Sequence, residues 1–242
     1  MYDLRQFGLK QMIESGRTLR GLGKHASNME EAAGEVASFL HHSFRDGGSQ
    51  TRNCVLVRCF KTHPFGTLPR DLQTTVLDRM ESVPPSEAMR CLCLLASCGE
   101  HPAWNGRHGS RDHRAIPLST SETVTNTPML AQLVKQLGLQ ISDLVAPDGM
   151  VDDSGLRTFD VFHVEEARGS RFVPDQAGFV EPWGVRSVLG FGGILPSQEL
   201  FAIVMFSRVP VGVETAKLFR TLALGVKLVL LPFVGKEIFG AN

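Results

Sequence analysis

The clearest pattern of hydrophobic and polar positions lies between residues 187 and 231. Residues 187–195 are rich in β-branched and large apolar side chains, residues 196–199 have the composition of a turn, and residues 200–206 are apolar without interruption. This pattern predicts a β-hairpin. Because an uninterrupted apolar run presents no polar face to water, we expect residues 200–206 to form a central strand that is covered on both sides.

Three glycines, Gly190, Gly192 and Gly193, interrupt the first of these two strands. Glycine inside a strand usually marks a bulge or a place where another group approaches the backbone closely. We therefore expect a bulge or tight packing against a helix. The alternative is a ligand that lies against the backbone here.

A long helix is predicted to begin near Val213 and to end at Leu231, because Pro232 cannot continue it. Four leucines of this helix, at positions 218, 224, 228 and 231, fall outside its main apolar stripe. One face of a sheet rarely covers so much apolar surface, so the helix is expected to form a homodimer with a second copy of the chain. The stripe itself consists of Ala216, Phe219, Leu222, Ala223, Val226, Val229 and Leu230.

Two helices are predicted before the first strand. The first covers residues 1–22, and the second follows Asn28, which forms a capping box with Glu31. Residues 99–185 are polar and turn-rich, and are expected to form an irregular insert. The remaining predicted elements are strands over 54–60, 89–97, 115–118 and 159–164 and helices over 69–80 and from 127 to 137.

This order of elements predicts an α+β fold with a central, mainly antiparallel sheet. N- and C-terminal helices and the loop-rich insert are expected to flank the sheet. No internal repeat or linker divides the chain, so residues 1–242 are expected to form a single domain. Within it, residues 1–27 form an N-terminal helix and linker, residues 28–231 the core and residues 232–242 a tail.

Composition narrows the classes of function. The chain is 43% hydrophobic and 21% charged, which is ordinary for a globular protein. Lys and Arg equal Asp and Glu at 25 each, so no charge pattern for binding nucleic acid or an anionic membrane is present. No apolar run reaches membrane-spanning length, and the N-terminus has no signal-peptide pattern. Five cysteines suggest reduced thiols, so we expect a cytoplasmic protein.

The layout resembles that of the GAF/PAS superfamily of sensory domains, and GAF domains more closely. Residues 158–164 and 186–193 also look like segments in the N-terminal sensor regions of bacterial hybrid histidine kinases. The resemblance covers most of residues 28–231 and implies a small-ligand sensory domain of a two-component system. Its matching pieces are the helix over 29–44, the strand over 54–60, the hairpin over 188–206 and the helix over 213–231.

A histidine inside an apolar strand is the main candidate for ligand binding. His163 lies between Phe162 and Val164, and is either a half-buried residue with satisfied hydrogen bonds or a polar group in a mostly apolar pocket. In the second interpretation, aromatic rings supply apolar surface and histidines supply hydrogen bonds or a haem or metal ligand. The pocket would then be lined by Trp104, His113, Phe162, His163, Trp183 and Phe191.

Further histidines are weaker candidates for a metal site. His101, His108 and His113 lie close together in one polar loop, and imidazoles of this kind are plausible ligands of Zn or Fe. Their spacing matches no compact metal motif, so a solvated loop is the favoured interpretation. His41 and His42 are adjacent on a predicted helix and are expected to point in different directions. No particular cofactor follows from the sequence, and haem or a metal stays open.

The cysteines allow a second interpretation of the function. Cys91 and Cys93 are predicted to share one face of a strand that Cys98 ends, and small buried apolar residues are the ordinary explanation. Free-methionine sulfoxide reductases are GAF-fold enzymes with cysteines in the ligand pocket, which would make these three cysteines the redox candidates. Their spacing does not reproduce the arrangement of that family. Phosphate-binding, zinc-protease and dinucleotide motifs are absent from the sequence.

We therefore expect a non-catalytic sensory module that binds a small molecule and acts as a dimer on a histidine kinase or another output partner. The alternatives are a thiol redox enzyme on the same fold and a ligand-free dimerisation module. The sequence does not identify the ligand, because one fold can host many different sites.

Overall fold

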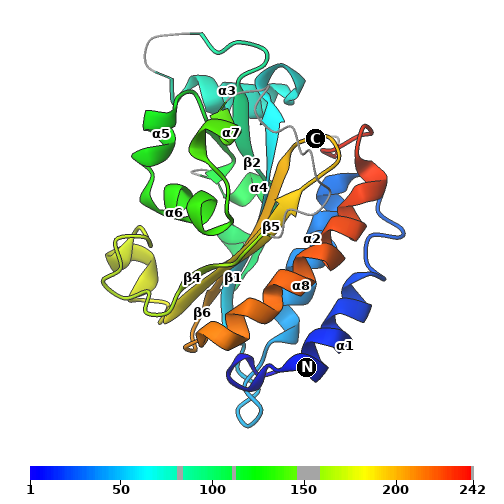
Figure 1. The fold of residues 1–242 in the computed structure, drawn as a ribbon, viewed down its shortest axis with the longest axis vertical. Coiled ribbons are helices and arrows are strands. Elements are labelled where there is room, and N and C mark those ends of the chain that lie inside the picture. Colours follow the sequence, from blue (N-terminus) through cyan, green and yellow to red (C-terminus); the bar gives the residue numbers. More distant parts are fainter. Residues whose placement is uncertain (81–83, 111–112, 146–158, 241–242) are drawn as a thin grey trace.

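The computed structural model describes residues 1–80, 84–110, 113–145 and 159–240. It contains one antiparallel sheet of six strands in the order β3-β2-β1-β6-β5-β4 (Figure 1). Helices flank this sheet, so the predicted α+β class is confirmed. The strands are β1 (Cys54–Pro64), β2 (Arg90–Gly99), β3 (Ala115–Pro117), β4 (Phe162–Val164), β5 (Ser187–Ile194) and β6 (Leu200–Ser207).

Two layers of helices cover the two faces of the sheet. We call the face under α1, α2 and α8 the helix face, and the face under α5, α6 and α7 the insert face (Figure 1). The helix-face elements are α1 (Leu9–Leu19), α2 (Met29–Ser43) and α8 (Val213–Leu230), with α3 (Arg70–Leu77) at one end. The insert-face helices are α5 (Ser121–Thr125), α6 (Pro128–Gln136) and α7 (Ile141–Val145).

The hairpin of β5 and β6 forms the centre of this arrangement, as the apolar pattern predicts. All eight residues of β6 are buried, and the strand lies between β1 and β5. A side chain at Gly192 would collide with the backbone carbonyl of Phe201 on β6, and one at Gly190 would lie 3.0 Å from Cβ of Phe162 on β4. The glycines therefore allow close packing, and the register shifts of the sheet lie elsewhere: opposite Cys59 and Phe60, where β2 has the extra residue Leu95, and between Cys54 and Leu56 of β1.

Helix α8 buries the predicted stripe, including Phe219 and Val226, against the sheet and α1. Leu224, Leu228 and Leu231 remain 59%, 43% and 39% exposed, and Leu218 is half-buried. The additional leucines thus lie on the outside of the molecule, as expected for a helix with a second apolar surface.

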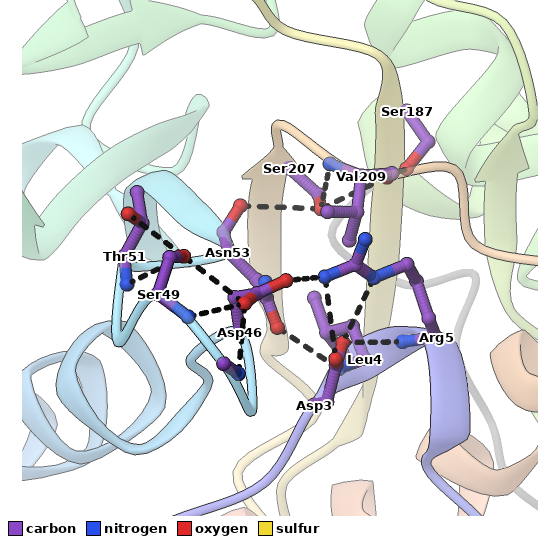
Figure 2. A network of polar contacts seen from close by, with 11 residues as sticks. Asp3, Leu4, Arg5, Asp46, Ser49, Thr51, Asn53, Ser187, Ser207 and Val209 are labelled. Carbon is purple, nitrogen blue, oxygen red and sulfur yellow. Dashed lines mark hydrogen bonds and ion pairs between the residues drawn. The ribbon is translucent and has the colours of Figure 1, made fainter.

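A polar network ties the N-terminus to the sheet (Figure 2). The side-chain oxygen of Asn53, just before β1, accepts a 2.9 Å hydrogen bond from the backbone N–H of Leu4. The backbone carbonyl of Asn53 accepts a 3.2 Å bond from the hydroxyl of Ser207 at the end of β6. Arg5 pairs with both Asp3 and Asp46. These contacts satisfy polar groups at one end of the sheet and have an evident structural role.

The last residues of the chain pack on the protein rather than extending from it as a tail. After the turn η6 (Leu231–Phe233), residues 234–239, which we call the C-terminal segment, return to the start of α2. The backbone N–H of Glu30 donates a 2.8 Å hydrogen bond to the carbonyl of Ile238, and Phe239 is only 8% exposed. This return covers the end of strand β1 on the helix face.

Candidate functional site

Two of the six predicted pocket residues meet on the insert face. The rings of Trp104, in the short helix η3 (Pro102–Trp104), and Trp183 lie 4.6 Å apart. Phe179 lies 5.3 Å from Trp104 and 5.0 Å from Phe206 of β6. These rings pack edge-on and tilted against one another. They contact each other and do not form an open surface for a ligand.

The other predicted residues are separated. Phe162 is fully buried on the insert face, whereas Phe191 is fully buried on the helix face, 5.5 Å from the ring of Phe219. His113 lies in the loop before β3, where its backbone N–H donates to the Ser110 carbonyl. The six side chains therefore do not share one face of the sheet.

His163 has satisfied hydrogen bonds. Its Nε2 lies 2.7 Å from the backbone carbonyl of Val211, and its backbone N–H donates to the side chain of Gln136 at 2.9 Å. A carbonyl only accepts, so Nε2 carries the proton of the neutral ring. These contacts tie β4 to the loop before α8 and to α6, which is the half-buried structural role that the sequence left open.

A cavity of about 460 Å³ lies at the opposite face, beneath the C-terminal segment. Its walls come from the end of β1, the turn before α3, the β5–β6 turn and the C-terminal segment. The side chains are Lys61, His63, Pro64, Thr67, Pro69, Ser197, Glu199, Val234, Lys236, Glu237, Ile238 and Phe239, with Gly235 completing the wall. The volume lies within the range of small-molecule sites.

Strand alternation places two of these polar residues on the helix face. Lys61 pairs with Cys93 and His63 with Cys91, and both cysteines belong to the helix-face core. Lys61 is 1% exposed and His63 is 3% exposed. Both side chains are thus buried in the inner wall of the cavity, where a polar group without a partner carries a free-energy cost.

Lys61 has partners for all three of its protons. Its Nζ lies 3.1 Å from the carboxylate of Glu199, 3.2 Å from the carbonyl of Thr62 and 3.4 Å from Nδ1 of His63. Burial lowers the pKa of Lys61, and the charge of Glu199 opposes that shift. The ion pair therefore stabilises a charged lysine in a place where an unpaired ammonium would lose its proton.

His63 is the unsatisfied member of the group. Burial, and then the charge of Lys61, hold the pKa of His63 well below its usual value, so the ring is neutral near pH 7. Because the ammonium of Lys61 can only donate, Nδ1 of His63 accepts and Nε2 carries the proton. Nε2 is buried and has no hydrogen-bond partner in the described part of the chain. The cavity wall thus holds a hydrogen-bond donor without an acceptor.

A buried arginine holds the C-terminal segment in place over the cavity. Arg107, in the short helix α4 (Gly106–Gly109), is 1% exposed and bonds Glu30 at 3.0 Å and Asp71 at 2.7 Å. Its guanidinium carbon lies 5.2 Å from the centroid of the Phe239 ring, and Glu30 also accepts from the backbone of Gly240 at 3.0 Å. These contacts hold the C-terminal segment over the cavity by polar bonds and one aromatic ring.

The three candidate redox cysteines lie in unreactive surroundings. Cys91 and Cys93 are fully buried in the helix-face core, as the alternation of the strand predicts. Burial raises the pKa of Cys91 to about 12, raises that of Cys93 well above its usual value and also raises that of Cys98. Thiolates are the reactive form, so these shifts work against the redox alternative.

The loop histidines are not brought together within the described residues. His101 accepts a hydrogen bond from the backbone N–H of Ala103 through Nδ1 at 3.2 Å and lies 5.4 Å from the Trp104 ring. His108 is exposed on α4. Among the described residues, the histidine, cysteine and carboxylate side chains that converge as a group of three lie elsewhere, at His41, His42 and Cys98.

The sequence contained a signal for the cavity that our pattern analysis did not use. Lys61 and His63 lie two residues apart in the extension of an apolar strand, so they share the face on which Cys59 is buried. A charged residue and a histidine on a core face need partners. The partners, Glu199 and the C-terminal segment, are distant in sequence, so pattern alone does not reveal the cavity.

Comparisons with known proteins do not identify a family. No protein family model matches the chain, and no curated protein matches it. The solved structure of an N-acylhomoserine lactone dependent LuxR family transcription factor, CepR2 from Burkholderia cenocepacia, is similar over 94% of this chain and 99% of that chain, with 13% identity and a TM-score of 0.44. A likeness at this level carries no argument about ligand or partners. No helix within the described ranges has the length and hydropathy to cross a membrane.

Proposed function

We propose that this chain is a sensory module that binds a small molecule in the cavity beneath the C-terminal segment. The observation that carries the proposal is the buried Nε2–H of His63, which lacks an acceptor in the wall of a cavity of ligand size. This nitrogen has almost no surface open to the cavity, so an acceptor on a ligand would reach it after a small shift of the wall, and satisfying a buried donor is a favourable change.

The charges of the wall limit the class of ligand. The lysines Lys61 and Lys236 balance the carboxylates Glu199 and Glu237, and His63 is neutral, so the lining has no net charge. The remaining wall is largely apolar, with prolines and the ring of Phe239. This favours a neutral molecule with an apolar body and a hydrogen-bond-accepting oxygen, such as a carbonyl.

The position of the cavity supports a signalling role. The C-terminal segment forms one wall and is continuous with the end of α8 through the turn η6. A ligand that binds better when this segment is closed would shift the equilibrium between two arrangements of the segment and α8. A histidine kinase or another output partner would detect that shift.

Native mass spectrometry of the protein purified from its own cells tests the proposal. Wild type should carry a bound organic mass, and Thr67→Trp should lose it because the indole fills the mouth of the cavity. Thr74→Trp, an exposed position on α3 outside the cavity, is the matched control and should keep the mass. A wild type without bound mass would favour the ligand-free module, and a mass retained by Thr67→Trp would place the ligand elsewhere.

The exposed leucines of α8 support the dimer. Leu224, Leu228 and Leu231 lie at helical spacing on one side of the helix and are each more than a third exposed. We propose that they pack against the same surface of a second copy, as a two-fold interface requires. Sedimentation equilibrium should give a dimer for wild type and a monomer for Leu224→Glu, whereas Lys217→Glu on the same helix should remain dimeric. A monomeric wild type would contradict the proposed dimer.

A further inference from the structure

Three potential metal ligands converge at the other end of strand β1. One ring nitrogen from each of His41 and His42 and the sulfur of Cys98 all lie within 4.8 Å of one another. The histidines are at the end of α2 and the cysteine is near the end of β2, where it pairs with Val57. His41 points into the core and His42 toward solvent, as expected for adjacent positions on a helix, yet their ring centroids lie only 4.9 Å apart.

His41 has no evident structural explanation. Its side chain is 1% exposed, and neither ring nitrogen makes a hydrogen bond of normal geometry within the described residues, although the ring lies near the backbone of Val55. A buried imidazole with two unsatisfied nitrogens is unusual and is costly unless something binds to it.

His42 has the hydrogen-bond pattern of a metal-binding histidine. Its Nδ1 lies 2.8 Å from the backbone carbonyl of Ser38, which can only accept, so Nδ1 carries the proton. The other ring nitrogen, Nε2, is therefore the one that can bind a metal. Histidines that bind metals commonly donate their other N–H to a backbone carbonyl in this way, which fixes the ring and its tautomer. The side chain is exposed, so the site is accessible from solvent.

The third ligand is a half-buried thiol. Cys98 binds a metal as the thiolate, so metal binding releases one proton to solvent. Donor atoms around a tetrahedral zinc lie roughly 3.3 to 3.7 Å apart, given Zn–N of about 2.0 Å and Zn–S of about 2.3 Å. The observed limit of 4.8 Å therefore needs a closing movement of about 1 Å, which the exposed ring of His42 can supply.

Some charges near the three residues favour a bound cation and others oppose it. Glu100 favours a cation at His41, whereas Arg52 opposes one; burial raises the pKa of the Cys98 thiol, and the charge of Arg52 partly offsets that shift. Arg208 binds the carboxylate of Glu100 with both of its terminal nitrogens, so Glu100 is held beside the site by that pair. Two nitrogens and one thiolate suit zinc, and a water molecule can take the fourth position on the open side.

We propose that His41, His42 and Cys98 bind one Zn²⁺ ion, which fastens the end of α2 to strand β2. This site is separate from the ligand cavity, which lies at the other end of β1 and shares no residue with it. The ion would satisfy the buried ring of His41 and would cross-link the helix to the sheet.

The test uses the full chain, stripped of metal by a chelator and titrated with Zn²⁺ and with Co²⁺ as a spectroscopic substitute. We expect one ion per chain, a thiolate-to-cobalt charge-transfer band and the intense visible bands of tetrahedral cobalt. Cys98→Ser should lose the charge-transfer band. Cys98→Ser and His42→Ala should each weaken Zn²⁺ binding by about tenfold or more, since even outer-sphere changes can have effects of this size.

Two further variants make the test decisive. His108→Ala, an exposed histidine on α4 outside the site, should bind as wild type does. Arg52→Gln should tighten Zn²⁺ binding because it removes the opposing charge. His42 is exposed, so His42→Ala is expected to fold even if variants of the buried His41 do not. Equal affinity of wild type, Cys98→Ser and His42→Ala, or the absence of a thiolate band with Co²⁺, would overturn the proposal.

Discussion

The two faces of the sheet differ in whether their buried histidines have hydrogen-bond partners. On the insert face, His163 has hydrogen-bond partners and the rings of Trp104, Trp183 and Phe179 pack against one another. On the helix face, His63 and His41 are buried with unsatisfied ring nitrogens. The insert face is not free of such atoms, since the hydroxyl of Ser97, opposite Arg58, is also buried without a partner, but the helix face holds two imidazoles in this state. In the proposed function, unsatisfied buried groups rather than aromatic rings mark the ligand site.

The largest effect should come from the packed insert face. Phe162→Ala removes a fully buried ring that packs beside Gly190, and we expect the free energy of unfolding to fall by about 3 to 5 kcal/mol. Urea denaturation followed by circular dichroism measures this change. A loss below about 1 kcal/mol would mean that this face is not filled as described and could itself hold a ligand.

The next effect concerns the ion pair in the cavity wall. Glu199→Gln leaves the ammonium of Lys61 buried without its counter-charge, which should lower the free energy of unfolding by about 3 kcal/mol near pH 7. The loss should shrink at higher pH, where the lysine can lose its proton. The matched control is Glu214→Gln, which breaks an exposed pair with Lys217 and should change stability by less than about 0.5 kcal/mol. Equal losses of stability in the two variants would show that the buried pair in the cavity wall contributes no more than an exposed pair.

Acid should weaken the fold through the histidines of the helix face. The folded pKa of His63 is lowered, so below the ordinary pKa of about 6.5 the unfolded chain binds a proton that the folded chain does not. The stability that the neutral ring contributes is therefore present above pH 6.5 and is lost as the pH falls. Between pH 7 and pH 5.5, wild type should lose about 1 kcal/mol more than His63→Leu. Parallel losses in urea titrations of the two proteins would contradict a buried neutral His63.

The smallest effect should come from the satisfied histidine. His163→Ala removes a single hydrogen bond to the Val211 carbonyl and should cost about 1 kcal/mol of stability. His63→Leu should instead change stability little near pH 7, because it removes both the unsatisfied Nε2–H and the 3.4 Å acceptor of Lys61, and the two changes oppose each other. Thermal denaturation of both variants compares the two faces directly. A larger loss of stability in His63→Leu than in His163→Ala would contradict the assignment of His63 as the unsatisfied histidine and His163 as the satisfied one.

The sequence predicted the fold well because its signals are local. The apolar run of β6, the capping box of α2 and the stripe of α8 each depend on residues near one another in the chain. The cavity depends on distant contacts: Glu199 reaches Lys61 across the sheet, and residues that looked like a tail return to α2. The metal-ligand group likewise joins a helix to a strand, which spacing along the chain does not show.

The measurement that tests the central claim most directly is native mass spectrometry of wild type, His63→Leu and His163→Ala, each purified from the native host. If the helix-face cavity is the ligand site, wild type and His163→Ala carry the same bound mass and His63→Leu has lost it. A bound mass that survives in His63→Leu and disappears in His163→Ala would contradict the account and place the ligand on the insert face.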